Sequence, residues 1–317
     1  MMDTGTYHDT SSWDGATALS GGSRRIPIST PSGDFMVWTR RFGTNPDLKV
    51  LLLHGGPAVG CEYLEPLDPW LMAAGVEFYH YDQLGAFRSD QPDDPSLWTL
   101  ERYVDEVEQV RTALGLGPDN MVLYGQSWGG LLALEYALTH PGTLKGLVIS
   151  NMMVSCPAYN HYARSVLMPA MDQDVLAEVQ AMEAEGHTDD PRYEELLVEH
   201  HYVHHVLRMP PEDWPDCIAR AFAHLNRAVY VPMQGPSELG LSGSLENWDR
   251  SDRLGEIDLP TLVIGATHDT MDPKHMEWMA GELPQGRYLH CPDGSHLCHV
   301  DDPEVYRTGL LEFLLSL

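Results

Sequence analysis

The motif Gly-x-Ser-x-Gly at residues 125–129 constrains this chain more than any other feature of its sequence. It follows an apolar run at 121–124 and passes directly into residues 131–138, whose leucines and tyrosine are typical of a helix. A strand that turns this sharply into a helix holds the serine at its apex with the hydroxyl exposed, and the flanking glycines leave room for the turn. The pattern predicts that Ser127 is a nucleophile, with a plain strand-to-helix turn as the alternative.

Segments typical of strands and of helices alternate along most of the chain. Such alternation predicts an α/β fold in which a mainly parallel sheet carries helices on both faces. Helices are expected from about Leu100 to Gly115, after Ser127, and over residues 303–315. The expected strands are 35–41, 50–53, 76–81, 121–124, 147–150, 261–265 and 288–291.

The alternation stops between residues 151 and 258, where helical patterns dominate. An insertion of roughly 100 residues is too long for a loop, so we predict a helical cap subdomain. Placed after a strand, the cap would lie over the carboxyl ends of the strands, where open α/β sheets bind their ligands. The predicted organisation is a flexible N-terminal tail at 1–24, an α/β core at 25–150 and 259–317, and the cap at 151–258.

The charge balance limits the classes of partner. The 317 residues include 19 basic and 47 acidic side chains, which give a formal net charge of −28. Such a surface repels nucleic acids and anionic membranes, so neither is expected as a partner. The N-terminal segment lacks the basic and apolar regions of a secretory signal, and no apolar run approaches the roughly 20 residues that span a bilayer. Five cysteines without paired spacing fit reduced thiols, and we expect a soluble, cytoplasmic protein.

A serine nucleophile needs a histidine base, and the histidine needs an acidic residue to orient it. In hydrolases with this motif, the acid and then the histidine follow the serine along the chain. Asp269 comes just after the expected strand 261–265, and His296 follows the last expected strand. Both would leave the same sheet edge as Ser127, so we predict a Ser127, Asp269, His296 triad. The other candidates are Asp272 for the acid, and His268 or His299 for the base.

The negative charge that develops on a carbonyl oxygen during acyl transfer requires fixed N–H donors. One donor is expected to be the amide of Trp128, directly after the nucleophile. The other is expected to be Gly56, in the loop after the strand 50–53, with Gly55 beside it facing the substrate. A tight loop that needs glycine for its backbone conformation is the alternative explanation for this pair.

Two further groups of polar residues lie in the predicted cap. His200, His201, His204 and His205 have a spacing that could hold a metal on a helix, but no cysteine or HExxH arrangement accompanies them. A polar helix explains them better, and we predict neither a metal nor an organic cofactor. Glu238, in a Gly-Pro-Ser-Glu turn, could reach into the pocket as a substrate ligand.

Several motifs occur in one order over about residues 25–317. They are HGGP at 54–57, YDQLG at 81–85, GxSxGG at 125–130, DWP at 213–215, GPSE at 235–238, WD at 248–249, SHL at 295–297 and DDPE at 301–304. This set resembles the proline iminopeptidases of the α/β-hydrolase fold, and most of all the branch with the tricorn-interacting aminopeptidase and bacterial L-amino-acid amidases. The resemblance implies the same triad and oxyanion donors. It also implies that Glu238 binds the free α-amino group of the substrate.

Two positions depart from the family pattern. Thr270 follows Asp269 where the family has a second glutamate that binds the amino group. Ala86-Phe87 replaces the usual Cys-Gly, which is expected to place the Phe87 ring near the pocket entrance.

The function implied is a serine hydrolase that cleaves the amide bond after an N-terminal residue. That residue would be proline or a small apolar amino acid of a short peptide or amino-acid amide, and the reaction would pass through an acyl-enzyme. One alternative, which Thr270 favours, is an esterase or amide hydrolase that needs no free amine. Another is an α/β-hydrolase that binds a small molecule without turnover.

Overall fold

The computed structural model describes residues 20–317, and its first strand, β1 (Ser20–Thr30), begins where this range begins. The predicted tail extends to Arg24, which is wrong for residues 20–24 because they belong to β1. Glycines and Pro27 are poor strand residues, but β1 is an edge strand paired along its length with β2 (Gly33–Phe42). Pairing therefore decides the structure of this segment over local propensity. The rest of the predicted tail lies outside the described residues.

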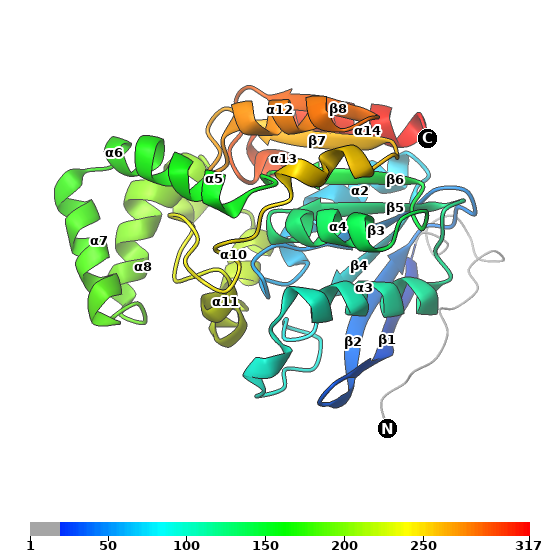
Figure 1. The fold of residues 1–317 in the computed structure, drawn as a ribbon, viewed down its shortest axis with the longest axis horizontal. Coiled ribbons are helices and arrows are strands. Elements are labelled where there is room, and N and C mark those ends of the chain that lie inside the picture. The colour runs from blue at the N-terminus through cyan, green and yellow to red at the C-terminus, as the bar shows by residue number, and fades with distance from the viewer. Residues whose placement is uncertain (1–19) are drawn as a thin grey trace.

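Within the described residues the sheet has eight strands in the order β1-β2-β4-β3-β5-β6-β7-β8 (Figure 1). The other strands are β3 (Lys49–Leu53), β4 (Glu77–Asp82), β5 (Met121–Gln126), β6 (Gly146–Ser150), β7 (Thr261–Ala266) and β8 (Gly286–Cys291). β1 and β2 are antiparallel, as are β2 and β4, and all other neighbours are parallel. The predicted mainly parallel sheet is confirmed, with β1 as an additional strand.

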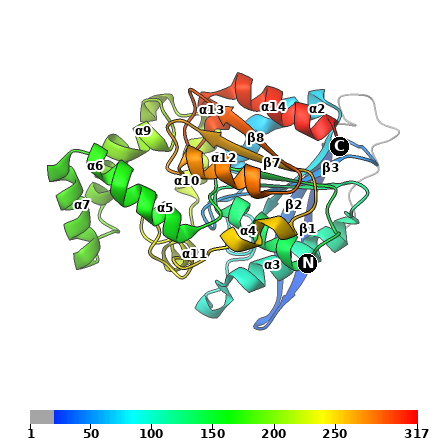
Figure 2. The same cartoon turned by 45° about the horizontal axis from the view of Figure 1, so that its top comes forward.

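Helices cover both faces of the sheet, and each face has its own apolar core. Leu51 and Leu53 of β3 belong to one core, whereas Val50 and Leu52 belong to the other, as the alternation of side chains along a strand requires. Figure 2 shows α14 and α2 on one side of the strands and α3 and α4 on the other. The helices of the first face are α3 (Leu100–Leu114), α4 (Trp128–Thr139) and α12 (Pro273–Glu282). Those of the second are α2 (Asp68–Ala73), α13 (Cys298–Asp301) and α14 (Pro303–Leu315).

The ends of α3 show how the sequence sets these elements. The Thr99 hydroxyl accepts a hydrogen bond from the Arg102 amide at 3.3 Å and so caps the first turn. At the other end Gly115 adopts a left-handed conformation, with φ of 65°, and stops the helix. The predicted limits of this helix are confirmed.

Residues 151–258, which we call the helical insertion, connect β6 to β7 and lie at one end of the sheet (Figure 1). Apart from one isolated bridge between Ser155 and Asp249, they contain helices. The α-helices are α5 (Cys156–Tyr162), α6 (Met168–Ala170), α7 (Gln173–Glu185), α8 (Pro191–Leu197), α9 (Val203–His205), α10 (Asp216–Ala223) and α11 (Arg227–Met233). Two π-helical turns, Ala163–Leu167 and Val198–Tyr202, and two 3-10 turns, Pro211–Asp213 and Ser251–Glu256, complete the insertion.

A buried charge network ties the insertion to the core. Glu62, in the 3-10 turn η1 (Glu62–Leu67), is almost fully buried. Its carboxylate contacts Arg220 of α10, the Nδ1 atom of His224 at 2.6 Å and Arg88 of the core at 3.3 Å. Because the Glu62 carboxylate is buried, loss of these partners would leave an uncompensated buried charge. This network fixes α10 against the loop that follows β3.

No helix within residues 20–317 is long and apolar enough to cross a lipid bilayer. All five cysteines are free thiols.

Candidate active site

Ser127 occupies the turn between β5 and α4, with φ of 56° and ψ of −128°. Positive φ is unusual for a residue with a side chain, so this turn stores backbone strain. A Cβ atom at Gly125 would lie 2.0 Å from the carbonyl oxygen of Gly129, and one at Gly129 would lie 2.2 Å from that of Leu53. Glycine is required at both positions for the strands and α4 to come this close. The predicted turn is present, and Ser127 lines a pocket at its apex.

The acid and the base expected from the sequence are in contact. His296 Nδ1 donates a hydrogen bond to Asp269 Oδ1 at 2.7 Å, and both residues are buried. The same carboxylate oxygen accepts from the Met271 amide at 3.1 Å. Because Nδ1 is engaged, the other ring nitrogen of His296 can serve as the base at the pocket that His296 and Ser127 share.

The alternative candidates have other roles. Asp272 caps α12, with its side chain accepting from the Lys274 amide at 3.0 Å. His299 donates from Nε2 to the Tyr63 carbonyl oxygen at 2.9 Å, and burial lowers its pKa to about 4. His268 presents its carbonyl oxygen to His205 at 3.0 Å. None of the three lines the pocket with Ser127.

Two backbone amides near Ser127 are available to an oxyanion. Among the described residues, the Gly56 and Trp128 amides donate to no protein acceptor. Trp128 is the first residue of α4, so its amide also carries the positive end of the helix dipole. The Gly55 amide differs, because it donates to the Tyr63 hydroxyl at 2.6 Å. The two amides expected from the sequence thus have no protein acceptor, and their role as oxyanion donors stays a prediction.

A hydrogen-bonded chain joins the oxyanion loop to the histidine. Tyr63, which accepts from the Gly55 amide, donates to Gln126 Oε1 at 2.7 Å, and Gln126 Nε2 donates to the His296 carbonyl oxygen at 2.9 Å. All four residues are buried. Neither Tyr63 nor Gln126 was expected at the site, although the place of Gln126 inside the Gly-x-Ser-x-Gly motif was a signal for it.

The pocket has a volume of about 40 Å³ and lies where the strand ends meet the helical insertion. The core contributes Gly55, Gly56, Val59, Tyr63, Gln126, Ser127, His296 and Leu297, and the insertion contributes Val206, Phe222 and Glu238. An adjoining cavity shares Ser127 and Glu238 and is otherwise mostly apolar. The insertion therefore covers the pocket at the carboxyl ends of the strands, which is where a cap inserted after β6 was expected.

Glu238 is the carboxylate of the helical insertion that reaches the pocket. Its Oε1 accepts from the Tyr230 hydroxyl at 2.5 Å, and its backbone carbonyl accepts from Tyr159 at 2.8 Å. Burial raises the pKa of Glu238, and the hydrogen bond from Tyr230 and the charge of His296 act in the opposite direction. Within residues 20–317, no lysine or arginine forms an ion pair with this carboxylate.

The chain is similar to known proteins along most of its length. Residues 50–308 match the family model described as alpha/beta hydrolase family. The chain belongs to the α/β-hydrolase family. It is 52% identical to a proline iminopeptidase of Flavobacterium johnsoniae over 289 residues, which cover 91% of this chain and 97% of the relative.

Two crystal structures resemble this member of the α/β-hydrolase family over almost their full length. The structure of VinJ superposes with a TM-score of 0.85 at 30% identity and covers 92% of this chain and 98% of VinJ. The proline iminopeptidase of Mycobacterium smegmatis gives a TM-score of 0.80 at 31% identity, with coverages of 93% and 98%. This α/β-hydrolase is therefore an enzyme, a hydrolase of the aminopeptidase group.

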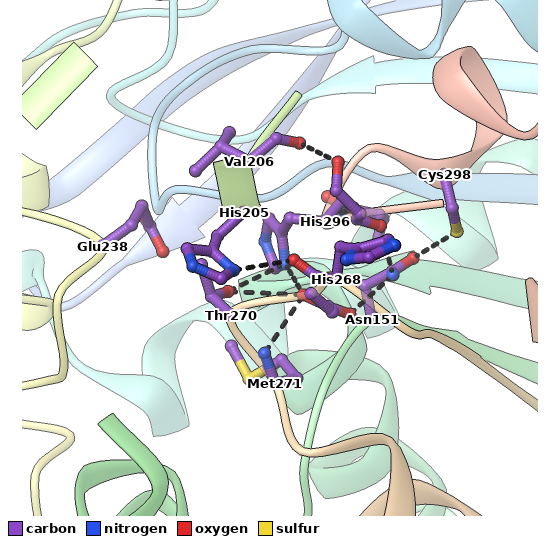
Figure 3. Close-up of polar contacts among 12 residues, drawn as sticks. Asn151, His205, Val206, Glu238, His268, Thr270, Met271, His296 and Cys298 are labelled. Carbon is purple, nitrogen blue, oxygen red and sulfur yellow. Dashed lines mark hydrogen bonds and ion pairs between the residues drawn. The ribbon is translucent and has the colours of Figure 1, made fainter. Parts of the chain in front are cut away.

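Thr270 is the first of the two positions where this α/β-hydrolase departs from its family pattern. It is fully buried, and its hydroxyl lies 3.3 Å from Asp269 Oδ1 and 3.2 Å from His296 Nδ1. A neutral donor thus supports the acid where the family has a second carboxylate. Figure 3 shows Thr270 turned toward His296, with Glu238 apart from them across the site.

Phe87 is the second position, and it is not among the residues that line the pocket. Its ring stacks on His224 with centroids 3.6 Å apart, and the Arg88 guanidinium lies 4.7 Å from its centroid. Phe87 does not line the pocket, whereas Phe222 of α10 does. Sequence alone could not reveal this, because the stacking depends on where the insertion returns to the core.

The four histidines of the insertion do not form a metal site. Among residues 20–317, no group of three or more His, Cys, Asp or Glu side chains is placed to hold an ion. His201 donates to the Glu238 carbonyl oxygen at 3.3 Å and His205 to that of His268 at 3.0 Å. His205 thus connects the insertion to the loop after β7, whereas the contact of His201 lies within the insertion.

Proposed function

We propose that this protein is a serine aminopeptidase that releases an N-terminal residue through an acyl-enzyme. Its substrates would be short peptides or amino-acid amides that begin with proline or a small apolar residue. The observation that carries the proposal is a single pocket lined by Ser127, His296 and Glu238. A nucleophile, its base and a carboxylate suited to an α-ammonium group converge there. The relative named proline iminopeptidase that is 52% identical supports the same assignment.

In the proposed reaction His296 takes the proton of the Ser127 hydroxyl while the oxygen attacks the substrate carbonyl carbon. The Ser127 hydroxyl has no hydrogen bond among the described residues, so its bond to His296 would form when substrate binds. The Gly56 and Trp128 amides would hold the resulting oxyanion. His296 then gives its proton to the departing nitrogen as the C–N bond breaks. Water, activated by the same histidine, hydrolyses the ester and releases the free amino acid.

The pocket and the adjoining cavity meet at Ser127 and Glu238, which line both. His296 protonates the leaving nitrogen in this scheme, so the leaving group belongs on the side lined by Val206, Phe222 and Leu297. The acyl residue then belongs in the adjoining cavity, which is small and mostly apolar. Its apolar walls are Leu131, Met152, Leu241, Leu245 and Met271. These walls support a small apolar acyl residue.

Glu238 supplies the requirement for a free amine in this proposal. Glu238 is partly exposed at the pocket, and a carboxylate held there without a cationic partner is costly unless a ligand brings the opposite charge. An α-ammonium group would meet that need through a charge-assisted hydrogen bond beside the one from Tyr230.

The second candidate is an esterase or amide hydrolase that needs no free amine. Thr270 favours it, because a hydroxyl replaces one of the two carboxylates that the family uses for the amino group. The experiment below separates the two candidates.

Glu238→Gln should reduce kcat/KM for substrates with a free α-amine by roughly 10- to 100-fold, mainly through KM, because a neutral amide cannot balance the ammonium charge. N-acetylated substrates should be hardly affected. The measurement compares chromogenic prolyl and alanyl anilides, with free and acetylated amines, on wild type and variant.

Glu246→Gln is the matched control, since Glu246 is an exposed glutamate of the same insertion. It should change neither class of substrate. Equal losses for free and acetylated substrates in Glu238→Gln would favour the second candidate.

The pH dependence should reveal the charge of Asp269. Burial lowers the pKa of His296, but the charge and hydrogen bond of Asp269, with the charges of Glu238 and Asp301, raise it above the ordinary 6.5. His296 must be neutral to accept the serine proton, so activity falls as pH drops through this raised pKa. The acid limb of kcat/KM should therefore have its midpoint above 6.5. A midpoint well below that value would contradict the assigned pair.

A further inference from the structure

Asn151, the residue after β6, has an unusual backbone for its position. It is fully buried and adopts φ of 53°, in the left-handed region that few residues other than glycine and asparagine tolerate. Its backbone amide continues the sheet by donating to the Ile264 carbonyl oxygen at 2.8 Å. The strained conformation is therefore held in place by β7, the strand that carries Asp269 at its end.

The side chain of Asn151 contacts both loops of the proposed triad. Its Nδ2 donates to Asp269 Oδ2 at 2.7 Å and to the Ser295 carbonyl oxygen, next to His296, at 3.2 Å. Asp269 Oδ1 is the oxygen that accepts from His296. Among the described residues, Asn151 is the donor to the second oxygen, Oδ2.

Neighbouring donors fix which end of the Asn151 amide faces Asp269. Oδ1 accepts from the Ser150 hydroxyl at 2.7 Å and from the Cys298 thiol at 3.3 Å, a contact visible in Figure 3. The Ser150 hydroxyl in turn lies 2.9 Å from that of Tyr306. Both N–H donors and both acceptor sites of the Asn151 amide are thus used. A flipped amide would place its NH2 group against the Ser150 and Cys298 donors.

We propose that Asn151 is a positioning residue that holds the Asp269 carboxylate with Oδ1 toward His296. The proposal rests on the triad assigned under the proposed function. A carboxylate with one free oxygen can rotate and exchange its two oxygens, which would weaken the bond to His296. With Oδ2 bound to Asn151 this rotation is blocked, and the imidazole keeps the orientation that it needs when it becomes charged.

Asn151→Gly tests the amide without straining the backbone, because glycine adopts positive φ freely. We expect kcat to fall roughly 10- to 100-fold with little change in KM, since one hydrogen bond to a charged group is lost where the imidazolium forms. The downfield proton resonance of His296 Nδ1 should shift or broaden. Asn45→Gly, at a remote asparagine that also bonds the backbone, should leave kcat and the resonance unchanged.

Asn151→Asp keeps the shape of the side chain and provides a second test if the glycine variant fails to fold. While protonated, the new carboxyl can donate to Asp269 as the amide does, but once ionised it places two carboxylates against each other. The ratio of variant to wild-type kcat/KM should therefore decrease as pH rises. The other titratable groups facing this position are the Cys298 thiol and, through Ser150, the Tyr306 phenol. Asp269, His296, Glu238 and Asp301 are the other charged groups of this site.

The positioning role would be overturned if both variants kept the wild-type kcat, pH profile and His296 proton resonance. A lower melting temperature alone would then leave Asn151 with a structural role. Ser127→Ala in the same assay distinguishes this from failure of the proposed function. If Ser127→Ala is inactive while both Asn151 variants behave as wild type, only the positioning role fails. If Ser127→Ala is fully active, the triad itself is wrong.

Discussion

Ser127→Ala should lower kcat by on the order of 10⁶-fold, because the acyl-enzyme can no longer form and the members of a triad act as a unit. The fold should persist, since the change removes a single hydroxyl with no hydrogen-bond partner among the described residues. The measurement is the steady-state hydrolysis of a free prolyl anilide, with the melting temperature recorded on the same preparation.

Ser165→Ala provides the comparison for this variant. Ser165 is an exposed serine of the helical insertion whose hydroxyl donates to the His161 carbonyl oxygen. It should keep wild-type turnover. Turnover by Ser127→Ala within a few-fold of wild type would place the nucleophile elsewhere.

Asp269→Asn should reduce kcat by roughly 10⁴-fold, because a neutral amide neither fixes the tautomer of His296 nor stabilises its positive charge. The acid limb of the pH profile should move to lower pH as well, since the charge that raises the His296 pKa is lost. Both effects are measured by kcat/KM across the pH range.

Asp272→Asn is the matched control, because both aspartates lie in the loop before α12. Asp272 caps that helix, and asparagine caps a helix about as well, so activity and stability should hardly change. A small loss of kcat in Asp269→Asn together with a large loss in Asp272→Asn would show that Asp272 is the acid instead.

The sequence predicted the parts of the fold whose pattern repeats locally. The strands that end at Leu53, Gln126 and Ala266 are short apolar runs, and each leads into polar residues at one sheet edge. Because parallel strands bring their carboxyl ends together, Ser127 and Asp269 could be placed near each other before any contact was known. His296 and the Gly55-Gly56 loop could be placed at the same sheet edge, because each follows a strand.

What the sequence could not predict depends on pairing across long separations. β1 contains two glycines and a proline, and only its pairing with β2 makes it a strand. Phe87 stacks on His224, a residue more than 100 positions away that the insertion brings to the core. Asn151 has no motif, and its role emerges from contacts with Asp269 and Cys298 on separate loops.

Glu238 shows both what the sequence could predict and what it could not. Its motif singled it out as a pocket residue, and it lines the same pocket as Ser127 and His296. Its hydrogen bond from Tyr230 and its lack of a cationic partner could be found only in three dimensions. These observations are the physical basis of the proposed free-amine requirement.

We propose above all that the enzyme recognises a free α-amine before Ser127 attacks. The most direct test is the ratio of kcat/KM for L-prolyl p-nitroanilide to that for its N-acetyl derivative, measured on one preparation of the wild-type enzyme. If Glu238 binds the ammonium group, the substrate with the free amine should be preferred over the acetylated one by roughly 10- to 100-fold or more. A ratio near one would contradict the aminopeptidase assignment and leave a serine hydrolase indifferent to the amine.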